Sequence, residues 1–163
     1  MNDTTRRSLA AADRILFLCS GNIVRSAFAE LYARHLACPL PVSSGGTTYR
    51  NLGGVYGDTA KELDRRGVDP ASVRAFRARH VDELRSELAP GTVVFGMTRK
   101  HLDAVARLHP EPARLHLLTE VLGERDEIAD PMFVGGFRKC FRRVADCVEA
   151  VVAHLNERAA APR

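Results

Sequence analysis

The sequence predicts an α/β fold, a three-layer sandwich in which helices cover both faces of a central four-stranded parallel sheet. Two observations support this fold. Short apolar runs that are typical of buried strands alternate along the chain with segments whose apolar residues recur every three or four positions. Such alternation favours a parallel sheet between two layers of helices. The 163 residues suffice for a hydrophobic core, and we expect residues 1–163 to form a single domain.

The elements can be assigned in order along the chain. Strands are expected at residues 15–18, 42–44, 92–97 and 114–117. Helices are expected at residues 27–36, 55–66, 81–88, 100–108 and, as the longest, 137–155. Three of them end at signals that stop a helix, namely Gly67, the pair Pro90-Gly91 and Pro110. The remaining ends, residues 1–12 and 158–163, are expected to be loose tails.

The composition argues against several classes of protein. The net charge of +4 comes from scattered basic residues, so a nucleic-acid partner is not expected. No apolar stretch approaches the length of a membrane span, and charges interrupt the N-terminal segment where a signal peptide would lie. The four cysteines form no Cys-x-x-Cys pair, and the six dispersed histidines are expected to be at the surface or partly buried. We therefore expect a cytoplasmic protein with no membrane association, no metal and no other cofactor.

The segment between the first expected strand and the first expected helix carries the clearest functional signal. Its residues are Cys19, Ser20, Gly21, Asn22, Ile23, Val24, Arg25 and Ser26. A loop at this place directs backbone N–H groups into one concavity at the positive end of a helix dipole, where a phosphate-sized anion binds. Cys19 would lie below that anion as a thiolate nucleophile, and Arg25 can hold two of its oxygens at once. A hydroxyl at Ser26 could stabilise the leaving thiolate.

Cys-x5-Arg alone is a weak motif in an arginine-rich chain. The alternative is a buried structural cysteine at a strand end, which is a common place for one. The position at a strand-to-helix turn, together with Gly21-Asn22, which supports unusual backbone dihedrals, favours the anion-binding loop.

The loop resembles the Cys-x-Gly-Asn-Ile-Cys-Arg-Ser loop of the low-molecular-weight protein tyrosine phosphatases, which also follows a first strand near the N-terminus. Four further segments are similar to segments of that family and occur in the same order, at residues 42–47, 76–79, 93–97 and 129–133. The resemblance implies that the loop after the first strand is a phosphatase loop. It also implies a hydrolase that works without a metal, through a phospho-cysteine intermediate.

The resemblance implies roles outside the loop as well. Asp130, which precedes Pro131, would be the general acid and then the base that activates water. Ser44 would brace the loop together with Asn22 and Ser26. An ordinary turn residue and an ordinary strand-end hydroxyl are the structural alternatives for Asp130 and Ser44. The expected substrate rim consists of Tyr49, Arg50, Met132 and Phe133.

Three positions depart from the family pattern. Val24 replaces a second cysteine, so the disulfide that would protect an oxidised nucleophile cannot form. Phe76 replaces a histidine of the bracing network, so the bracing is either thinner or completed by another group. Arg50 replaces an aromatic residue of the rim, which leaves phosphotyrosine selectivity open. By contrast, Ile23 stands where phosphoarginine phosphatases of this fold have Thr, and it favours an aryl substrate.

The sequence therefore predicts a protein-tyrosine-phosphatase-like enzyme whose partner is a phosphorylated protein or a small-molecule phosphate monoester. A phosphoarginine or metabolite phosphatase is the alternative. Arsenate reduction would need further redox cysteines, and none lies between residues 39 and 139. A phosphate-binding module without turnover is disfavoured because Cys19, Arg25 and Asp130 are all present. The sequence leaves the oligomeric state open.

Overall fold

The four strands form one parallel sheet with the first strand in its interior. The computed structural model describes residues 1–161. The strands pair in the order β2-β1-β3-β4, and every pairing is parallel. Their bounds are Arg14–Cys19 for β1, Val42–Gly46 for β2, Thr92–Gly96 for β3 and Leu115–Leu117 for β4. The predicted sheet is confirmed, and each strand begins and ends within two residues of its expected position.

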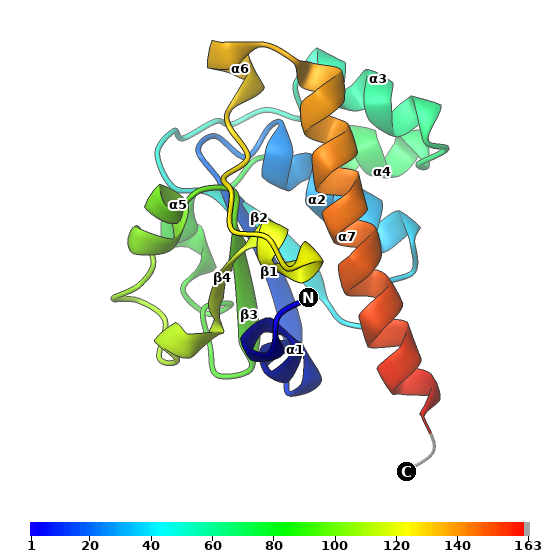
Figure 1. The fold of residues 1–163 in the computed structure, drawn as a ribbon. Helices are drawn as coiled ribbons and strands as arrows, with labels where there is room; N and C mark the ends of the chain where they lie inside the picture. Colours follow the sequence, from blue (N-terminus) through cyan, green and yellow to red (C-terminus); the bar gives the residue numbers. More distant parts are fainter. Residues whose placement is uncertain (162–163) are drawn as a thin grey trace.

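Helices cover both faces of this sheet (Figure 1). The α-helices are α1 (Asp3–Ala10), α2 (Arg25–His35), α3 (Gly57–Arg65), α4 (Pro70–Ala75), α5 (Arg99–Asp103), α6 (Pro131–Val134) and α7 (Phe137–Ala160). Three short 3-10 helices are η1 (Val81–Leu84), η2 (Pro112–Arg114) and η3 (Leu118–Leu122).

Alternate side chains of β1 point to opposite faces of the sheet and enter two separate cores. Phe17 and Cys19 belong to the larger core, which also contains buried residues of α1, α2 and α7. Leu16 and Leu18 belong to the smaller core, which includes residues of η1. The cysteine therefore lies on the face covered by α2 and α7.

Two expected helices are shorter than the sequence predicted. Residues 81–88 contain only the 3-10 helix η1, and residues 100–108 contain only the start of a helix, α5, followed by turns. The apolar residues of both segments, Leu84, Leu88 and Val105 among them, do reach the smaller core. An apolar pattern requires burial on one side, and a single turn satisfies that requirement as well as a full helix does.

Both chain ends differ from the expected loose tails. The N-terminal segment forms α1, in which the Asn2 side chain accepts a hydrogen bond from the Thr5 N–H at 2.8 Å and Leu9 is fully buried. Arg158 of α7 donates to the carbonyl of Leu9 at 3.0 Å, and α7 itself continues to Ala160. Residues 162–163 of the expected tail lie outside the described residues. These contacts of α1 with α7 join residues far apart in the chain, and local sequence does not reveal them.

The carboxyl ends of β1 and β2 meet at one edge of the sheet, where Cys19 pairs with Gly46. A Cβ atom at Gly46 would lie 2.9 Å from the carbonyl oxygen of Ser20. Glycine at this position lets the loop after β1 approach the end of β2 closely. Among residues 1–161, no helix has both the length and the apolar character that spanning a bilayer requires.

We expect Leu9→Ala to lower the free energy of unfolding by about 2–5 kcal/mol, because it opens a cavity where α1 enters the core. Urea unfolding followed by circular dichroism measures this loss. Leu52→Ala is the matched control, since Leu52 is 92% exposed and its truncation should change stability by no more than about 0.5 kcal/mol. Equal stabilities of the two variants would show that α1 adds nothing to the core.

Candidate active site

The loop between β1 and α2 holds a buried thiol among hydrogen-bond donors. Cys19 is 2% exposed, and its Sγ lies 2.9 Å from the Ser26 hydroxyl and 3.3 Å from the backbone nitrogen of Asn22, which donates to it. Because α2 begins at Arg25, the N–H groups of its first turn have no carbonyl of a preceding helical turn to bind. The loop therefore surrounds the thiol with groups that favour a negative charge.

Asn22 holds this loop in shape. Its backbone has a φ of +56°, in the left-handed region that few residues other than glycine adopt. Its side-chain Nδ2 donates to the hydroxyls of Ser26 and Ser44, both at 2.8 Å. Its Oδ1 accepts a hydrogen bond from the backbone N–H of Arg79 at 2.9 Å. The fully buried side chain thus ties the loop to α2, to β2 and to the segment after α4.

Glu30 extends this network, and the sequence interpretation did not include it. The Ser44 hydroxyl donates to Glu30 Oε1 at 2.9 Å, and Glu30 also pairs with Arg34 at 3.1 Å. Burial raises the pKa of Glu30, while the Arg34 charge opposes that rise. Phe76, which replaces the expected histidine, is 7% exposed and packs in the larger core.

Groups other than a histidine therefore take part in this network. Glu30 and the backbone N–H of Arg79 supply the additional contacts. The available signal for Glu30 was its place four residues after Ser26, on the same face of the helix.

The buried guanidinium of Arg25 joins the loop to the segment before α6. Arg25 is 2% exposed, and its Nη1 donates to the Ile128 carbonyl at 2.8 Å. Its Nη2 lies 3.2 Å from Asp130 Oδ2 and 3.4 Å from the Ser20 hydroxyl. The other carboxylate oxygen of Asp130 accepts from the N–H of Met132 at 3.0 Å and so caps α6. The fold therefore brings residues 25 and 130 together.

His101 is almost fully buried next to the loop, whereas the sequence predicted a surface or partly buried side chain. It is 2% exposed, and its Nδ1 accepts a hydrogen bond from the Thr98 backbone N–H at 3.0 Å. Burial, followed by the charges of Arg25 and Lys100, lowers the pKa of His101 to about 3. The neutral ring therefore carries its proton on Nε2, which donates to the Ser20 hydroxyl at 3.0 Å. The six histidines are dispersed along the chain and form no motif, so the sequence did not indicate the contact between His101 and Ser20.

A pocket of about 230 Å³ opens at the loop. Its lining residues are Cys19, Gly21, Ile23, Val24, Arg25, Tyr49, Asn51, Asp130, Met132 and Phe133. Asn51, which the sequence interpretation did not include, donates to the Gly21 carbonyl at 2.8 Å.

The structure places most of the expected site residues at or behind this pocket. Three of the four rim residues line it, but Arg50 does not, because its side chain pairs with Asp82 and is 61% exposed. The aromatic ring of Tyr49 takes that side of the pocket instead. The remaining polar residues do not line the pocket: Ser20, Asn22 and Ser26 belong to the loop itself, and Ser44 on β2 accepts a hydrogen bond from Asn22.

Comparison with known proteins identifies the same family that the sequence resembles. A family model described as low molecular weight phosphotyrosine protein phosphatase matches residues 14–161. The low molecular weight protein-tyrosine-phosphatase PtpB of Staphylococcus epidermidis is 28% identical over 141 residues, which cover 85% of this chain and 96% of PtpB.

Solved structures share the fold. YfkJ from Bacillus subtilis superposes with a TM-score of 0.76 at 21% identity and covers 90% of this chain and 96% of its own. The YwlE arginine phosphatase from Geobacillus stearothermophilus superposes with a TM-score of 0.69 at 27% identity and covers 90% of this chain and 92% of its own.

We expect the His101 ring to remain neutral, with its proton on Nε2, from pH 8 down to pH 5. Ring ¹⁵N chemical shifts measure both the charge and the tautomer. The unfolded chain binds a proton near pH 6.5 that the folded chain does not bind until about pH 3, so this histidine lowers stability as the pH falls between those values.

The His101→Asn variant lacks this titrating group. As the pH falls below 6.5, its free energy of unfolding should therefore rise relative to that of the wild type by up to about 1.4 kcal/mol per pH unit. A parallel pH dependence of the two proteins, or a ring that titrates between pH 5 and 8, would contradict the assigned contact.

Proposed function

This chain belongs to the low molecular weight phosphotyrosine protein phosphatase family, and we propose that it hydrolyses aryl phosphate monoesters through a phospho-cysteine intermediate without a metal ion. The observation that carries this proposal is the convergence of Cys19, Arg25 and Asp130 on one pocket of about 230 Å³. A nucleophile, a cationic clamp and a carboxyl group are the three parts that such a hydrolysis needs.

In the first step, the Cys19 thiolate attacks phosphorus, forming an S–P bond while the bond from phosphorus to the leaving oxygen breaks. Asp130 donates a proton to that oxygen, so the product leaves as a neutral alcohol or phenol. The Asn22 N–H and the Ser26 hydroxyl both lie within hydrogen-bonding distance of Sγ, where they can donate to the attacking sulfur.

In the second step, water attacks the phospho-cysteine. The Asp130 carboxylate takes a proton from the water, the S–P bond breaks, and inorganic phosphate is released. The Ser26 hydroxyl stabilises the thiolate that leaves, since it lies 2.9 Å from Sγ. Each chemical bond that breaks is matched by one that forms, and Asp130 returns to its protonated state.

The guanidinium of Arg25 has N–H donors that could bind the phosphoryl group of a substrate. Its Nε is buried and has no hydrogen-bond partner among residues 1–161. A buried donor without a partner costs roughly 1–3 kcal/mol, and a phosphoryl oxygen would remove that cost. If a second phosphoryl oxygen takes Nη2, Asp130 Oδ2 is released from its ion pair and becomes available to the leaving oxygen.

The pocket walls favour a flat apolar leaving group. Tyr49, Met132, Phe133 and Ile23 supply apolar surface, and aromatic walls suit a phenyl ring. A guanidinium leaving group would need a carboxylate partner in the pocket. Among the described lining residues Asp130 is the only acid, and proton transfer already requires it. Phosphoarginine remains the second candidate because of the similarity to an arginine phosphatase at 27% identity.

A reductase that passes a disulfide along several cysteines is disfavoured. Cys140 and Cys147 lie in α7, and burial raises the pKa of both thiols to about 12. Two thiols that stay protonated inside a regular helix are poor partners for disulfide exchange.

We expect the wild type to hydrolyse p-nitrophenyl phosphate in the presence of EDTA, and Cys19→Ser to lose at least about 10³-fold in kcat because the nucleophile is gone. Cys38→Ser, at a half-buried cysteine outside the pocket, is the control and should keep its activity. Dependence of the wild type on added metal, or an active Cys19→Ser, would overturn the mechanism.

Phosphotyrosine and phosphoarginine, compared by kcat/KM, decide between the two substrate classes.

We expect Asp130→Asn to slow hydrolysis of phenyl phosphate by about 10²-fold or more, and of p-nitrophenyl phosphate by much less. Phenoxide needs a proton to leave, whereas nitrophenoxide does not. Asparagine also caps helices, so α6 should persist in the variant. Measuring kcat for both substrates tests the role, and equal small losses would remove Asp130 from proton transfer.

A further inference from the structure

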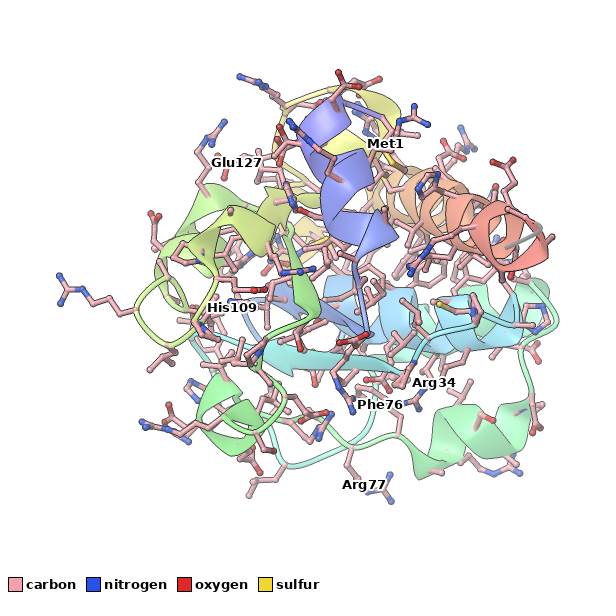
Figure 2. The ribbon with its side chains drawn as sticks, turned by 90° about the horizontal axis from the view of Figure 1, so that it is seen from below. Met1, Arg34, Phe76, Arg77, His109 and Glu127 are labelled. Atoms are coloured by element: carbon pink, nitrogen blue, oxygen red, sulfur yellow. The ribbon has the colours of Figure 1, made fainter. Side chains whose placement is uncertain are left out.

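A second and larger cavity lies beside the edge strand β2 and shares no lining residue with the catalytic pocket. Its volume is about 720 Å³, within the range of pockets that bind small molecules. It is bounded by α2, by β2 and by the segments around α4 and η1. Arg34 and Phe76 lie near each other on this side of the molecule (Figure 2).

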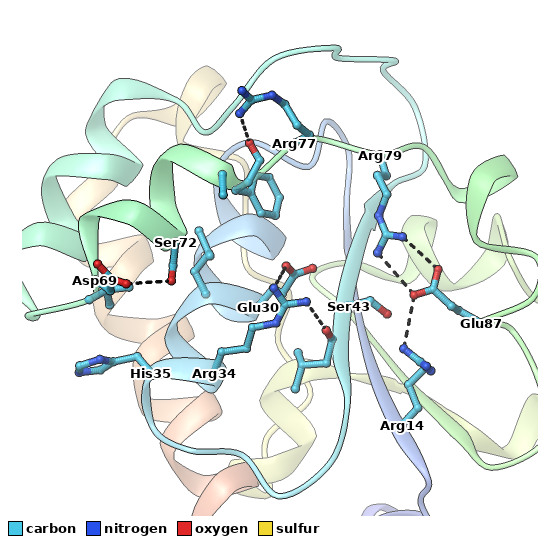
Figure 3. A pocket seen from close by; sticks show the side chains of 15 residues that line it. Arg14, Glu30, Arg34, His35, Ser43, Asp69, Ser72, Arg77, Arg79 and Glu87 are labelled. Carbon is cyan, nitrogen blue, oxygen red and sulfur yellow. Dashed lines mark hydrogen bonds and ion pairs between the residues drawn. The ribbon is translucent and has the colours of Figure 1, made fainter.

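One wall of the cavity carries more guanidinium donors than it has acceptors. Arg14 and Arg79 both bind Glu87 (Figure 3), at distances of 3.4 Å and 3.2–3.5 Å. Strong charge-assisted hydrogen bonds are shorter, at about 2.7–2.9 Å. One carboxylate is thus shared loosely between two cations, whose side chains are 34% and 37% exposed. The wall keeps a net positive charge and N–H donors for a further acceptor.

The Ser43 hydroxyl supplies a second, independent observation. Ser43 is 2% exposed, and its Oγ has no hydrogen-bond partner among residues 1–161. The side chain lies between the Glu30–Arg34 pair and the Glu87 cluster (Figure 3). Buried hydroxyls almost always have a partner, so this one is an unsatisfied group in the wall of the cavity, and rotation of the serine side chain would let it donate to a ligand there.

The remaining walls define what else the ligand must contain. Phe76 and Val68 contribute apolar surface, whereas Arg34 is already engaged by Glu30 and by the Val42 carbonyl. A ligand that satisfies both kinds of wall carries an anionic group at one end and an apolar body at the other.

We propose that this cavity is a second ligand site, which binds a small organic oxyanion. The anionic group binds Arg14, Arg79 and Ser43, and the apolar body lies against Phe76 and Val68. A carboxylate and a phosphate-type group share the chemistry that these donors recognise. The proposal does not depend on the reaction in the catalytic pocket.

Isothermal titration calorimetry of the full chain tests the proposal, and variants of residues that line only this cavity separate its binding from that of the catalytic pocket. The probes are phenylacetate, phenylphosphonate and, as the neutral control, phenylacetamide. We expect saturable binding of at least one anion and none of the amide. Which anion binds more tightly identifies the ligand class.

Matched variants locate the binding. Arg14→Gln should weaken it by about 10-fold and Ser43→Ala by roughly 3-fold, the scales of a charged and a neutral hydrogen bond. Arg85→Gln, at an exposed arginine outside the cavity, should leave it unchanged. Ser43→Ala removes only an unpartnered hydroxyl, so it remains informative even if Arg14→Gln fails to fold.

Three results would overturn the proposal. These are no saturable binding of either anion up to millimolar concentration, equal binding of the amide, and wild-type affinity in the folded variants at residues 14 and 43.

Discussion

The left-handed turn at Asn22 is the constraint on which the site depends. Asparagine tolerates a φ of +56° better than most residues with a side chain, and contacts of that side chain can fix the turn in place. Here the same side chain makes three hydrogen bonds, to Ser26, Ser44 and the backbone of Arg79. Because these bonds reach α2, β2 and the segment after α4, three elements determine the shape of the loop. That shape places the Asn22 N–H and the Ser26 hydroxyl against the Cys19 thiol.

The buried charge of Arg25 extends this arrangement across the molecule. A guanidinium out of water must be paired and hydrogen-bonded. Its partners, the Ile128 carbonyl and the Asp130 carboxylate, lie more than a hundred residues further along the chain. Burial is the main cause of the lowered pKa of the neighbouring His101, and the Arg25 charge adds to it, so one buried cation influences both sides of the loop. In the proposed mechanism, substrate binding would redistribute these contacts.

Sequence reasoning performed best where the signal was local. The residues at the loop are contiguous, and periodicity placed the strands and α7 closely. It was wrong about Arg50, which turns toward Asp82, and about α1, which was expected to be a loose tail. It could not find His101, because a single histidine carries no pattern that reveals a distant hydroxyl partner, and it missed Glu30, whose only signal was its spacing from Ser26 on α2.

The sequence by itself determined the parallel sheet, the position of the loop at a strand end and the three residues, Cys19, Arg25 and Asp130, to which the proposed mechanism assigns roles. These follow from spacing along one segment at a time. Only the tertiary structure decided which groups brace the loop, which side chains form the rim and that a second cavity lies beside β2. The physical reason is that hydrogen bonds, ion pairs and burial join residues far apart in the chain, and only the folded geometry selects among the possible partners.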